Sequence, residues 1–475
     1  MRTEKVFLGI DLGTTGIRAI LTDEKGCILS SQSTSVEKSF VQSKNEKHSE
    51  QNPKEWEPAL FRVVDRIFTS LERAELQAIT VDSTSGTIIP VDREGNPLHN
   101  ALMHNDIRAH EEANFISSST DLIMQPSFAL AKILWLKRQK PHLFERTYKF
   151  IHAADYLKGL LSGDYWTSDF SNAVKTGYDL SGFRWPGVIE KTLDIPLEKL
   201  PRVVKTGEVV AELKERLRDQ YGIKNRVHIV AGATDSTTSF YSSGARLKGD
   251  WNTTLGTVLG IRGIAENFIR DPEGLIYAHR HPEGYWLPGA ASNTGGEALR
   301  MFFRDDLKEY DRRIEALPPT GAFVYPLARK SEKFPFHNMD AHGFIKMELC
   351  DPVYLFKAFL EGASFLERMI YEKISEIGYE VGERIFSMGG GAYSMPWMNI
   401  RASILNRHII RAKEVETAFG SAIIAASGVH YSSLSEAIEY MVQEELSVEP
   451  DRQLCARYEE LYDQFILECR KRNFF

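Results

Sequence analysis

Two glycine-threonine turns and a run of three glycines are the parts of this 475-residue chain whose composition best suits phosphate chemistry. Gly13-Thr14-Thr15 and Gly256-Thr257 each follow a short apolar run. Backbone N–H groups and threonine hydroxyls in such turns donate hydrogen bonds to phosphate oxygens. Each turn alone is typical of a β-hairpin, whereas the pair together predicts a site that holds a triphosphate from both sides.

The glycine run Gly389-Gly390-Gly391 comes directly after another apolar stretch. Three glycines remove every side chain at the end of a strand, so that a flat group or a phosphate can lie against the backbone. A flexible loop or a tight turn is the alternative interpretation. Together with the two turns, the run favours a nucleotide site.

Two aspartates lie beside strand ends. Asp11 precedes the first turn, where it is placed to hold Mg²⁺ through water molecules. Asp235 lies between a predicted strand, residues 227–232, and a helix rich in serine and threonine. It is either a helix cap or a general base that takes the proton from an attacking hydroxyl during phosphoryl transfer, and the two roles are compatible.

A loop of small hydroxyl residues, Ser83-Thr84-Ser85, follows another buried strand pattern and is suited to a small polar ligand. Asp106 and Arg108 form either a surface ion pair or part of a sugar site. His279 and His281 share one face of a predicted strand, but without a third ligand at suitable spacing they favour a polar strand over a metal site.

Several common catalytic motifs are absent. The chain has no Gly-Lys dipeptide and therefore no Walker A loop, and GxGxxG, HExxH and GxSxG are also missing. P-loop NTPases, standard Rossmann dehydrogenases, zincins and α/β-hydrolases are thereby excluded. The remaining pattern is one that handles phosphate without a P-loop lysine.

Composition points to a cytoplasmic protein that binds neither nucleic acid nor membrane. The net charge is -7 and the pI is about 6.1, whereas nucleic-acid surfaces are usually basic. The cysteines Cys27, Cys350, Cys455 and Cys469 show no CxxC spacing, so the sequence predicts neither a disulfide framework nor a zinc site. No leader pattern and no long apolar run is evident.

The predicted elements alternate between strands and helices, which is typical of an α/β protein. A β-meander is expected within residues 6–40, and an N-cap pattern at Asn52-Pro53 opens a helix. A long apolar helix is expected from residue 351 to about 377, and a small-residue helix over residues 418–426. The Leu-Gly-Thr turn occurs twice, roughly 240 residues apart, which indicates either a duplicated domain or a chance match.

These segments together resemble the FGGY family of carbohydrate kinases over nearly the whole chain. Gly9 to Gly16 is similar to the family's first phosphate motif, Gly232 to Asp235 to its catalytic-aspartate segment, and Leu255 to Thr257 to its second phosphate motif. Gly389 to Trp397 is similar to the adenosine motif and Glu416 to Ala422 to the closing helix.

The resemblance implies an α/β fold with two actin/hexokinase/Hsp70-ATPase-like (ribonuclease H-like) domains flanking a cleft. Residues 1–245 would hold the sugar and the catalytic Asp235, and residues 246–475 would hold ATP. The implied ATP and Mg²⁺ site consists of Asp11, Gly13, Thr14, Thr15, Gly256, Thr257, Gly295, Gly390, Gly391 and Ala392. The implied substrate site consists of Ser83, Thr84, Ser85, Asp106, Thr234 and Asp235.

Within the family, the segments 233–236 and 289–296 and the loop 81–87 are most similar to the short xylulokinase-like D-ribulose kinases of cyanobacteria and plants. The chain departs from the family at two places. His104 stands where the family has a tryptophan, and Asn399 and Arg401 replace a glutamine and its neighbours on the adenosine helix.

The expected activity is therefore phosphorylation of the terminal primary hydroxyl of a ketopentose, with D-ribulose and ATP giving D-ribulose 5-phosphate and ADP. D-xylulose or another polyol is an alternative substrate, and a non-kinase ATPase or a sugar-binding regulator on the same fold is an alternative from another class. The expected partners are a small sugar and ATP, and the chain is expected to be a monomer or a homodimer.

Overall fold

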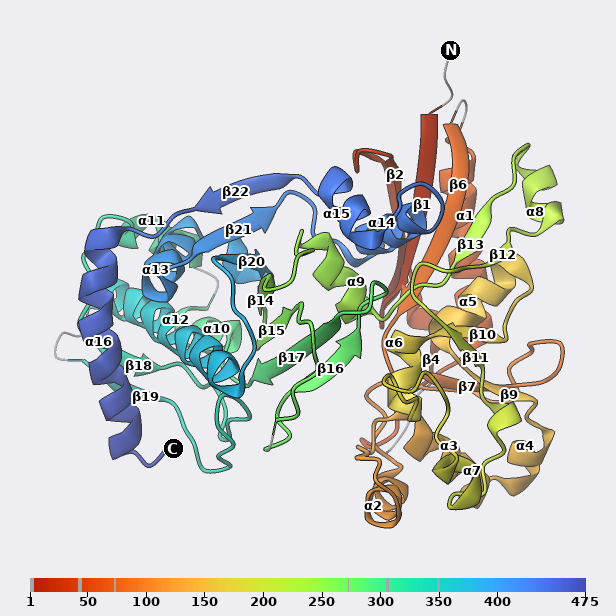
Figure 1. Cartoon of the computed structure of the whole chain (residues 1–475), viewed down its shortest axis with the longest axis horizontal. Coiled ribbons are helices and arrows are strands. Elements are labelled where there is room, and N and C mark those ends of the chain that lie inside the picture. The colour runs from red at the N-terminus through yellow and green to blue at the C-terminus, as the bar shows by residue number, and fades with distance from the viewer. Residues whose placement is uncertain (1–3, 42–44, 72–73, 272, 305–306, 348–350) are drawn as a thin grey trace. The chain divides into compact units, whose positions relative to one another are not determined.

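The computed structural model describes residues 4–41, 45–71, 74–271, 273–304, 307–347 and 351–475 (Figure 1). Cys350 lies outside these ranges. The chain forms two compact units, one of Met1–Ser242 with Val415–Val442 and one of Ser243–Glu414 with Gln443–Phe475. The sequence predicts a division between residues 245 and 246. In the structure, residues 415–442 also belong to the first unit, which that prediction does not include.

A six-stranded sheet forms the centre of the first unit, in the order β12-β13-β6-β1-β2-β3. β1 pairs antiparallel with β2 and parallel with β6, which in turn pairs parallel with β13. The predicted β-meander at the start of the chain is confirmed. The strands are β1 (Glu4–Leu12), β2 (Gly16–Asp23), β3 (Ile28–Ser35), β6 (Ala74–Ser83), β12 (Val209–Glu212) and β13 (His228–Val230).

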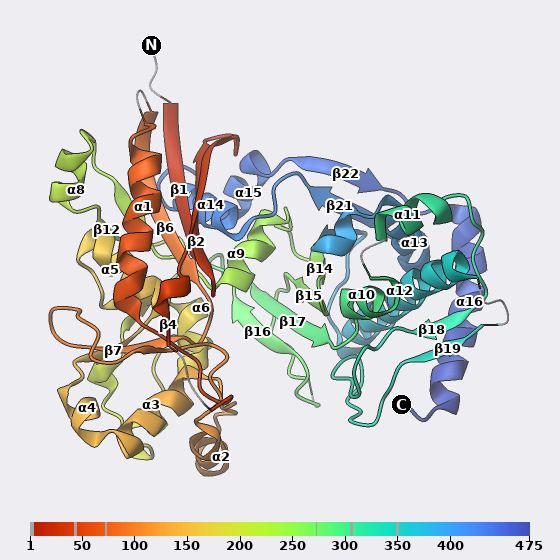
Figure 2. The ribbon, with the colours of Figure 1, turned by 180° about the vertical axis from the view of Figure 1, so that it is seen from behind.

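Helices α1 (Trp56–Phe68) and α14 (Thr417–Val429) cover opposite faces of this sheet (Figures 1 and 2). Asn52 caps the short 3-10 turn before α1, as its sequence predicts. α14 is rich in small residues because it lies very close to β1, where a Cβ on Gly9 would lie 1.9 Å from the Ala418 carbonyl oxygen. Gly9 and Asp11 thus point toward α14, while Leu8 and Ile10 pack in the core that includes α1.

The rest of the first unit consists of short strands that alternate with helices. Its further strands are β4 (Phe40–Val41), β5 (Glu50–Gln51), β7 (Ile88–Val91), β8 (Ala101–Leu102), β9 (Lys149–His152), β10 (Thr167–Asp169) and β11 (Arg202–Val204). Its further helices are α2 (His110–Ser119), α3 (Ala129–Gln139), α4 (Pro141–Arg146), α5 (Ala153–Ser162), α6 (Phe170–Ala173), α7 (Val188–Lys191), α8 (Glu215–Gln220), α9 (Asp235–Ser242) and α15 (Leu434–Met441).

A seven-stranded sheet forms the centre of the second unit, in the order β16-β17-β15-β14-β20-β21-β22. The sheet's strands are β14 (Trp251–Leu255), β15 (Leu259–Gly263), β16 (Tyr277–Arg280), β17 (Trp286–Ser292), β20 (Arg384–Met388), β21 (His408–Ala412) and β22 (Glu444–Val448). The other elements are β18 (Phe323–Tyr325), β19 (Phe344–Lys346), α10 (Gly296–Phe303), α11 (Leu307–Ile314), α12 (Pro352–Ile377), α13 (Met395–Leu405) and α16 (Arg452–Lys471).

The two sheets share one strand order and one set of strand directions. The order β3-β2-β1-β6-β13-β12 in the first unit corresponds to β17-β15-β14-β20-β21-β22 in the second, and every neighbouring pair has the same parallel or antiparallel sense. The units differ at one edge, because β12 precedes β13 in the chain whereas β22 follows β21. This correspondence favours duplication over a chance match of the Leu-Gly-Thr turns.

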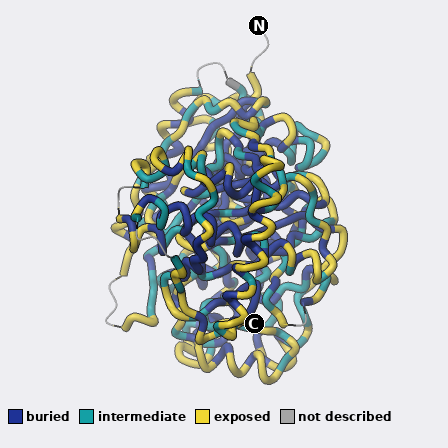
Figure 3. The backbone as a smooth tube through the Cα atoms, turned by 90° about the vertical axis from the view of Figure 1, so that its left-hand side faces the viewer, coloured by how far each residue is buried: buried dark blue, intermediate teal, exposed yellow. Residues whose placement is uncertain are grey.

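Most residues of β1 and β14 are buried, and much of the exposed backbone lies toward the outside of the tube (Figure 3). The α/β fold class is confirmed. Among the residues that the structure describes, no helix has both the length and the apolar character needed to cross a bilayer.

Candidate functional site

Three carboxylates converge at one end of the first unit's sheet. Asp11 in β1 and Asp82 in β6 are register partners on neighbouring parallel strands. Asp235 is the first residue of α9, and the preceding Thr234 forms a bridge to Ser83 at the end of β6. The sequence places Asp11 and Asp235 in the site but does not single out Asp82, whose position follows only from strand pairing.

The pKa values of Asp11 and Asp82 are both raised, because the two carboxylates are buried and other negative charges lie nearby. Burial raises the pKa of Asp11 to about 6, and the charge of Asp235 acts in the same direction. Burial, followed by the charge of Asp11, raises the pKa of Asp82 well above its ordinary value. Ser421 on α14 donates a 2.5 Å hydrogen bond to Oδ2 of Asp82. The cluster therefore favours a proton or a cation.

Asp11 fits a magnesium ion held through water. Its Oδ1 atom is buried and accepts no hydrogen bond from any described residue. Among the described residues, no three His, Cys, Asp or Glu side chains, those of this cluster included, are grouped so that they could hold a metal ion directly. Mg²⁺ commonly uses one or two carboxylates together with water and substrate phosphates, so one free carboxylate oxygen is compatible with such a site.

The first glycine-threonine turn connects β1 to β2 and is held by three hydrogen bonds. The N–H of Gly13 donates to the Gly16 carbonyl over 2.9 Å, Val36 donates to the Thr15 carbonyl over 3.0 Å, and the Gln51 side chain donates to the Thr14 carbonyl over 2.8 Å. These bonds fix the backbone of the turn and leave the Thr15 side chain exposed.

The hydroxyls predicted to contact substrate are largely occupied by the protein itself. Ser83 accepts a hydrogen bond from the Ala154 N–H over 3.0 Å, and Thr84 pairs with the Thr87 hydroxyl at 3.0 Å. Thr234 has no exposed surface and pairs with the Ser171 hydroxyl at 2.9 Å. Ser85 in this loop is partly exposed, and so is Asp235 at the start of α9.

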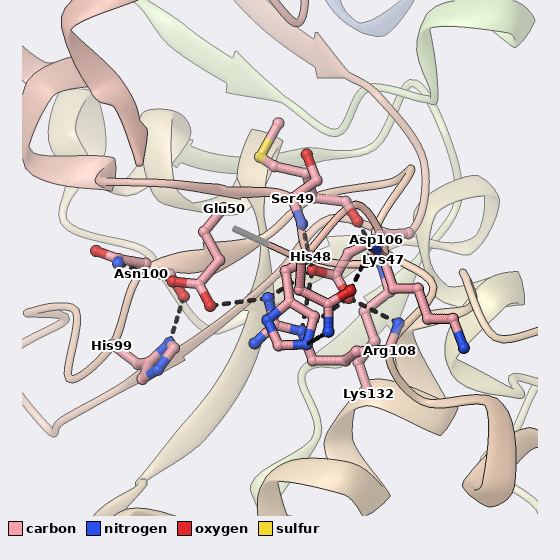
Figure 4. A network of polar contacts seen from close by, with 12 residues as sticks. Lys47, His48, Ser49, Glu50, His99, Asn100, Asp106, Arg108 and Lys132 are labelled. Atoms are coloured by element: carbon pink, nitrogen blue, oxygen red, sulfur yellow. Dashed lines mark hydrogen bonds and ion pairs between the residues drawn. The ribbon is translucent and has the colours of Figure 1, made fainter. Parts of the chain in front are cut away.

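Asp106 lies in a buried polar network (Figure 4). Its Oδ2 atom accepts hydrogen bonds from the Ser49 N–H and from Arg108, and its Oδ1 atom accepts from the Arg108 backbone and Nε. Arg108 also pairs with Glu50 at 2.8 Å. A substrate would have to displace one of these donors, so Asp106 is better suited to fix the surrounding backbone than to bind a sugar directly.

Lys132 on α3 lies close to this network (Figure 4). Its ammonium group is fully buried and donates hydrogen bonds to the Gly86 carbonyl over 2.9 Å and the Met103 carbonyl over 2.6 Å. Burial lowers the pKa of Lys132 to about 7, with the charge of Asp106 acting in the opposite direction. A neutral amine retains both N–H groups that these bonds use.

The lowered pKa of Lys132 predicts that the stability of the protein depends on pH. Between about pH 7 and the ordinary pKa of 10.5, the unfolded chain retains the lysine proton while the folded chain releases it, so the free energy of unfolding rises with pH. Denaturant titrations of the wild type and Lys132→Met across this interval should show that the substitution removes the rise. The exposed Lys205→Met should retain it, and identical pH profiles for Lys132→Met and wild type would contradict the assignment.

In the second unit, the turn between β14 and β15 rests against the start of α10. The Gly296 N–H donates to the Gly256 carbonyl over 2.8 Å, and the Glu297 N–H to the Thr257 carbonyl over 3.2 Å. A Cβ on Gly295 would lie 2.6 Å from the Thr257 carbonyl oxygen. This close approach explains the glycine at 295 and leaves the Thr257 side chain exposed.

The glycine run follows β20, which pairs directly with β14, and therefore lies beside the second turn. Gly389 has a φ of +79°, and a Cβ there would lie 2.5 Å from the Leu255 carbonyl oxygen. A Cβ on Gly390, by contrast, would have no other atom within 4 Å among the described residues. The predicted nucleotide residues of this unit are thus close together, with open space at Gly390.

This contrast predicts different results for two alanine substitutions. Gly389→Ala should destabilise the protein by at least about 1 kcal/mol, because its backbone conformation and its contact with β14 both exclude a side chain. Gly390→Ala, the matched control, should change the melting temperature little. Thermal unfolding of both variants checks this, and equal stability of the two would contradict it.

Two residues near the glycine run, Asp311 and Arg411, were not predicted from the sequence. Ser394 caps α13 and donates a 2.8 Å hydrogen bond to Asp311. Arg411 donates to the Ala392 carbonyl over 2.8 Å and lies over the ring of the exposed Tyr393. Asp311 and Arg411 come from α11 and β21, so only the tertiary structure shows their proximity.

At the two positions on α13 where the chain departs from the family, Arg401 is buried in the core of the second unit and Asn399 is exposed. Arg401 is fully buried and forms a bidentate ion pair with Glu367, with both N···O distances at 2.7 Å. It also donates a 2.5 Å hydrogen bond to Ser387 in β20. Asn399 lines a separate pocket of about 320 Å³. Arg401 therefore has a structural role in the second unit's core.

His279 and His281 lie at the edge strand β16 and just beyond it, and both are buried. Burial lowers the pKa of His281 to about 4. His104, where the resemblance predicts a tryptophan, is partly exposed and donates its backbone N–H to Thr87 over 3.1 Å.

Comparison with known proteins gives consistent matches over nearly the whole chain. Residues 6–241 match the N-terminal domain model, and residues 266–429 the C-terminal domain model, of the FGGY family of carbohydrate kinases. A xylulose kinase from Bacillus subtilis is 24% identical, with 97% of this chain and 96% of the relative covered. A gluconokinase from the same organism is also 24% identical, with 97% of this chain and 94% of the gluconokinase covered. The crystal structure of a "xyloylose kinase" from Brucella ovis has a TM-score of 0.88 at 22% identity, covering 98% of this chain and 99% of that one.

Proposed function

Because this chain belongs to the FGGY family of carbohydrate kinases and is a phosphotransferase, we propose that it transfers the terminal phosphoryl group of ATP to the terminal primary hydroxyl of a ketopentose. The single observation that carries the proposal is the convergence of Asp11, Asp82 and Asp235 at one end of the first unit's sheet.

Asp235 is the proposed general base. Its carboxylate is partly exposed at the start of α9, whereas Asp82 is fully buried and burial raises its pKa well above the ordinary value. It would take the proton from the sugar hydroxyl as the oxygen attacks the terminal phosphorus and the bond to ADP breaks. Asp106 and Lys132 would act as positioning residues that hold the loops around the acceptor.

Asp11 would hold Mg²⁺ through water, and the ion would supply positive charge to the phosphates. The turn Gly13-Thr14-Thr15 and the turn Gly256-Thr257 would donate hydrogen bonds to phosphate oxygens from backbone and hydroxyl groups. The backbone at Gly390, Gly391 and Ala392 would lie against the adenosine, where Gly390 has open space.

Two ketopentoses are the leading substrates. The likeness of the segments 81–87, 233–236 and 289–296 to D-ribulose kinases supports D-ribulose. Several curated relatives are named xylulose kinase, which supports D-xylulose. A cytoplasmic location and a monomeric or homodimeric state stay predictions from the sequence.

A coupled ADP-release assay over a panel of pentuloses, hexuloses, pentitols and glycerol tests this proposal. We expect ADP release to depend on the sugar, to require Mg²⁺ and to be fastest with D-ribulose or D-xylulose. Release at the same rate with and without every sugar would instead indicate an ATPase and would overturn the proposal.

A further inference from the structure

Glu332 is a buried carboxylate of the second unit that neither the sequence motifs nor the proposed chemistry uses. It lies between β18 and β19 and has no exposed surface. Burial of a carboxylate is costly unless hydrogen-bond donors replace the water that it loses. Five groups donate hydrogen bonds to Glu332. They are the hydroxyls of Ser292, Thr294 and Tyr325, at 2.9, 3.1 and 3.0 Å, and the backbone N–H groups of Asn293 and Lys333, at 2.7 and 2.8 Å.

Three of these five donors belong to the segment Ser292-Asn293-Thr294, which connects β17 to α10. The Asn293 side chain donates a further hydrogen bond to the Ser331 carbonyl over 2.9 Å. Movement of the segment would leave the carboxylate buried without its donors, which costs free energy. Glu332 therefore fixes the path of the chain into Gly295, the residue before α10.

The Gly256-Thr257 turn rests on the part of the chain that Glu332 fixes. The Thr294 carbonyl accepts a 2.7 Å hydrogen bond from the N–H of Leu259, the first residue of β15 after the turn. The first residues of α10 donate to the two carbonyls of the turn itself. The turn is thus bound at its start and at its end to residues 294–297.

Glu332 is in turn held in place by the core of the second unit. Its backbone N–H donates to the Asn338 carbonyl over 2.8 Å, and the Asn338 N–H donates to its carbonyl over 3.0 Å. Between these two residues, Phe334 and Phe336 are buried in the core. The Asn338 side chain donates to the Phe474 carbonyl over 3.2 Å. The carboxylate is therefore a fixed support for the segment that it binds.

We propose that Glu332 is the positioning residue that sets the Gly256-Thr257 turn for the phosphates of the nucleotide. This inference rests on the proposed function, in which that turn donates hydrogen bonds to phosphate oxygens. A misplacement of about 1 Å by a change far from the chemistry can cost about 100-fold in rate, so a residue that touches no substrate can still determine how well phosphates are held. Loss of Glu332 should therefore affect the phosphates more than the adenosine or the sugar.

Calorimetric titration with ATP and Mg²⁺, and separately with adenosine, tests the inference, because only ATP carries the phosphates. Glu332→Ala should weaken ATP binding by about 10- to 100-fold and adenosine binding by less than about 3-fold. In steady-state assays of the same variant, the KM for ATP should rise and the KM for the sugar should not.

The conservative variant Glu332→Gln should restore most of the ATP affinity, to within about 5-fold of the wild type. Its amide oxygen can accept from the two backbone N–H groups that now bind Oε1. Its NH₂ group then faces the three hydroxyls that bind Oε2, and hydroxyls can accept as well as donate.

Glu361 provides the matched control. It is also a buried glutamate of the second unit, and it accepts hydrogen bonds from Thr320 and Tyr458, which lie outside the segments described for Glu332. Glu361→Ala should destabilise the protein and leave ATP affinity within about 3-fold of the wild type. If Glu332→Ala does not fold, Thr294→Val is titrated in its place, since it removes one of the five donors and should weaken ATP binding in the same direction by a smaller factor.

Three results would overturn the inference: unchanged ATP binding in the Glu332 variant or its replacement, an equal loss of ATP and adenosine binding, or the same loss of ATP binding in Glu361→Ala. Titration needs no turnover, so these results do not depend on which sugar the protein accepts. Absence of sugar-dependent ADP release by the wild type would instead overturn the proposed function.

Discussion

Replacement of Asp235 by Asn is expected to lower kcat for sugar phosphorylation by about 10³-fold or more, because the amide cannot accept the proton of the attacking hydroxyl. The side chain of Asn is nearly the same size, so the fold should persist. In this structure Asp235 Oδ1 accepts a 2.7 Å hydrogen bond from the Ser236 N–H, which an amide oxygen also accepts. ATP affinity should therefore change little.

Asp451 provides the matched control for Asp235. It is also an aspartate at a helix start, and its carboxylate caps α16 by accepting hydrogen bonds from Gln453 and Leu454. Asp451→Asn should leave kcat within about 2-fold of wild type. The loss of a helix cap changes stability by about 1 kcal/mol but removes no group that takes part in the reaction. Steady-state kinetics and nucleotide binding on both variants check this. If Asp235→Asn kept more than a tenth of wild-type kcat, the role of general base would be wrong.

Breaking the buried ion pair in the second unit is expected to cause the largest loss of stability. Glu367→Gln should reduce the free energy of unfolding by about 3–5 kcal/mol, because it leaves the charge of Arg401 buried without a full partner. The pair also involves Thr253 in β14 and Ser387 in β20, so its loss should weaken the strands that lead into Gly256 and the glycine run. The Michaelis constant for ATP should rise as a consequence.

Two further variants make this stability prediction specific. Glu460→Gln removes an exposed ion pair with Arg457 and should cost less than about 1 kcal/mol. The double replacement Glu367→Met with Arg401→Met should be less destabilised than Glu367→Gln, because no unpaired charge remains. Denaturant unfolding at one pH compares the three. Equal losses for Glu367→Gln and Glu460→Gln would contradict a central role for the buried pair.

Local sequence patterns were sufficient to predict most of the elements that hold the site. The β-meander at the start of the chain and the long helix α12 follow from alternation, caps and helical spacing, which are properties of neighbouring residues. The return of α14 to the first unit could not be predicted this way. It depends on the close fit of Gly9 against Ala418, residues that are far apart in the chain.

The candidate site shows the same limit. Asp11 and Asp235 are recognisable from the strand ends beside them, but Asp82 becomes a member of the cluster only through the pairing of β1 with β6. Ser83 and Thr234 look available in the sequence, whereas their hydroxyls are used within the protein. Spacing shows which residue types lie near each other, but not which of their hydrogen bonds are already made.

Product identification by ³¹P and ¹³C nuclear magnetic resonance is the most direct measurement, with ATP, Mg²⁺ and uniformly ¹³C-labelled D-ribulose or D-xylulose as reactants. For the wild type we predict a phosphomonoester whose phosphorus couples to the terminal carbon C5, formed in equal amount to ADP. Asp235→Asn should give no detectable ester over the same period. Formation of inorganic phosphate and ADP with the sugar unchanged, or an ester formed equally by both proteins, would contradict the account.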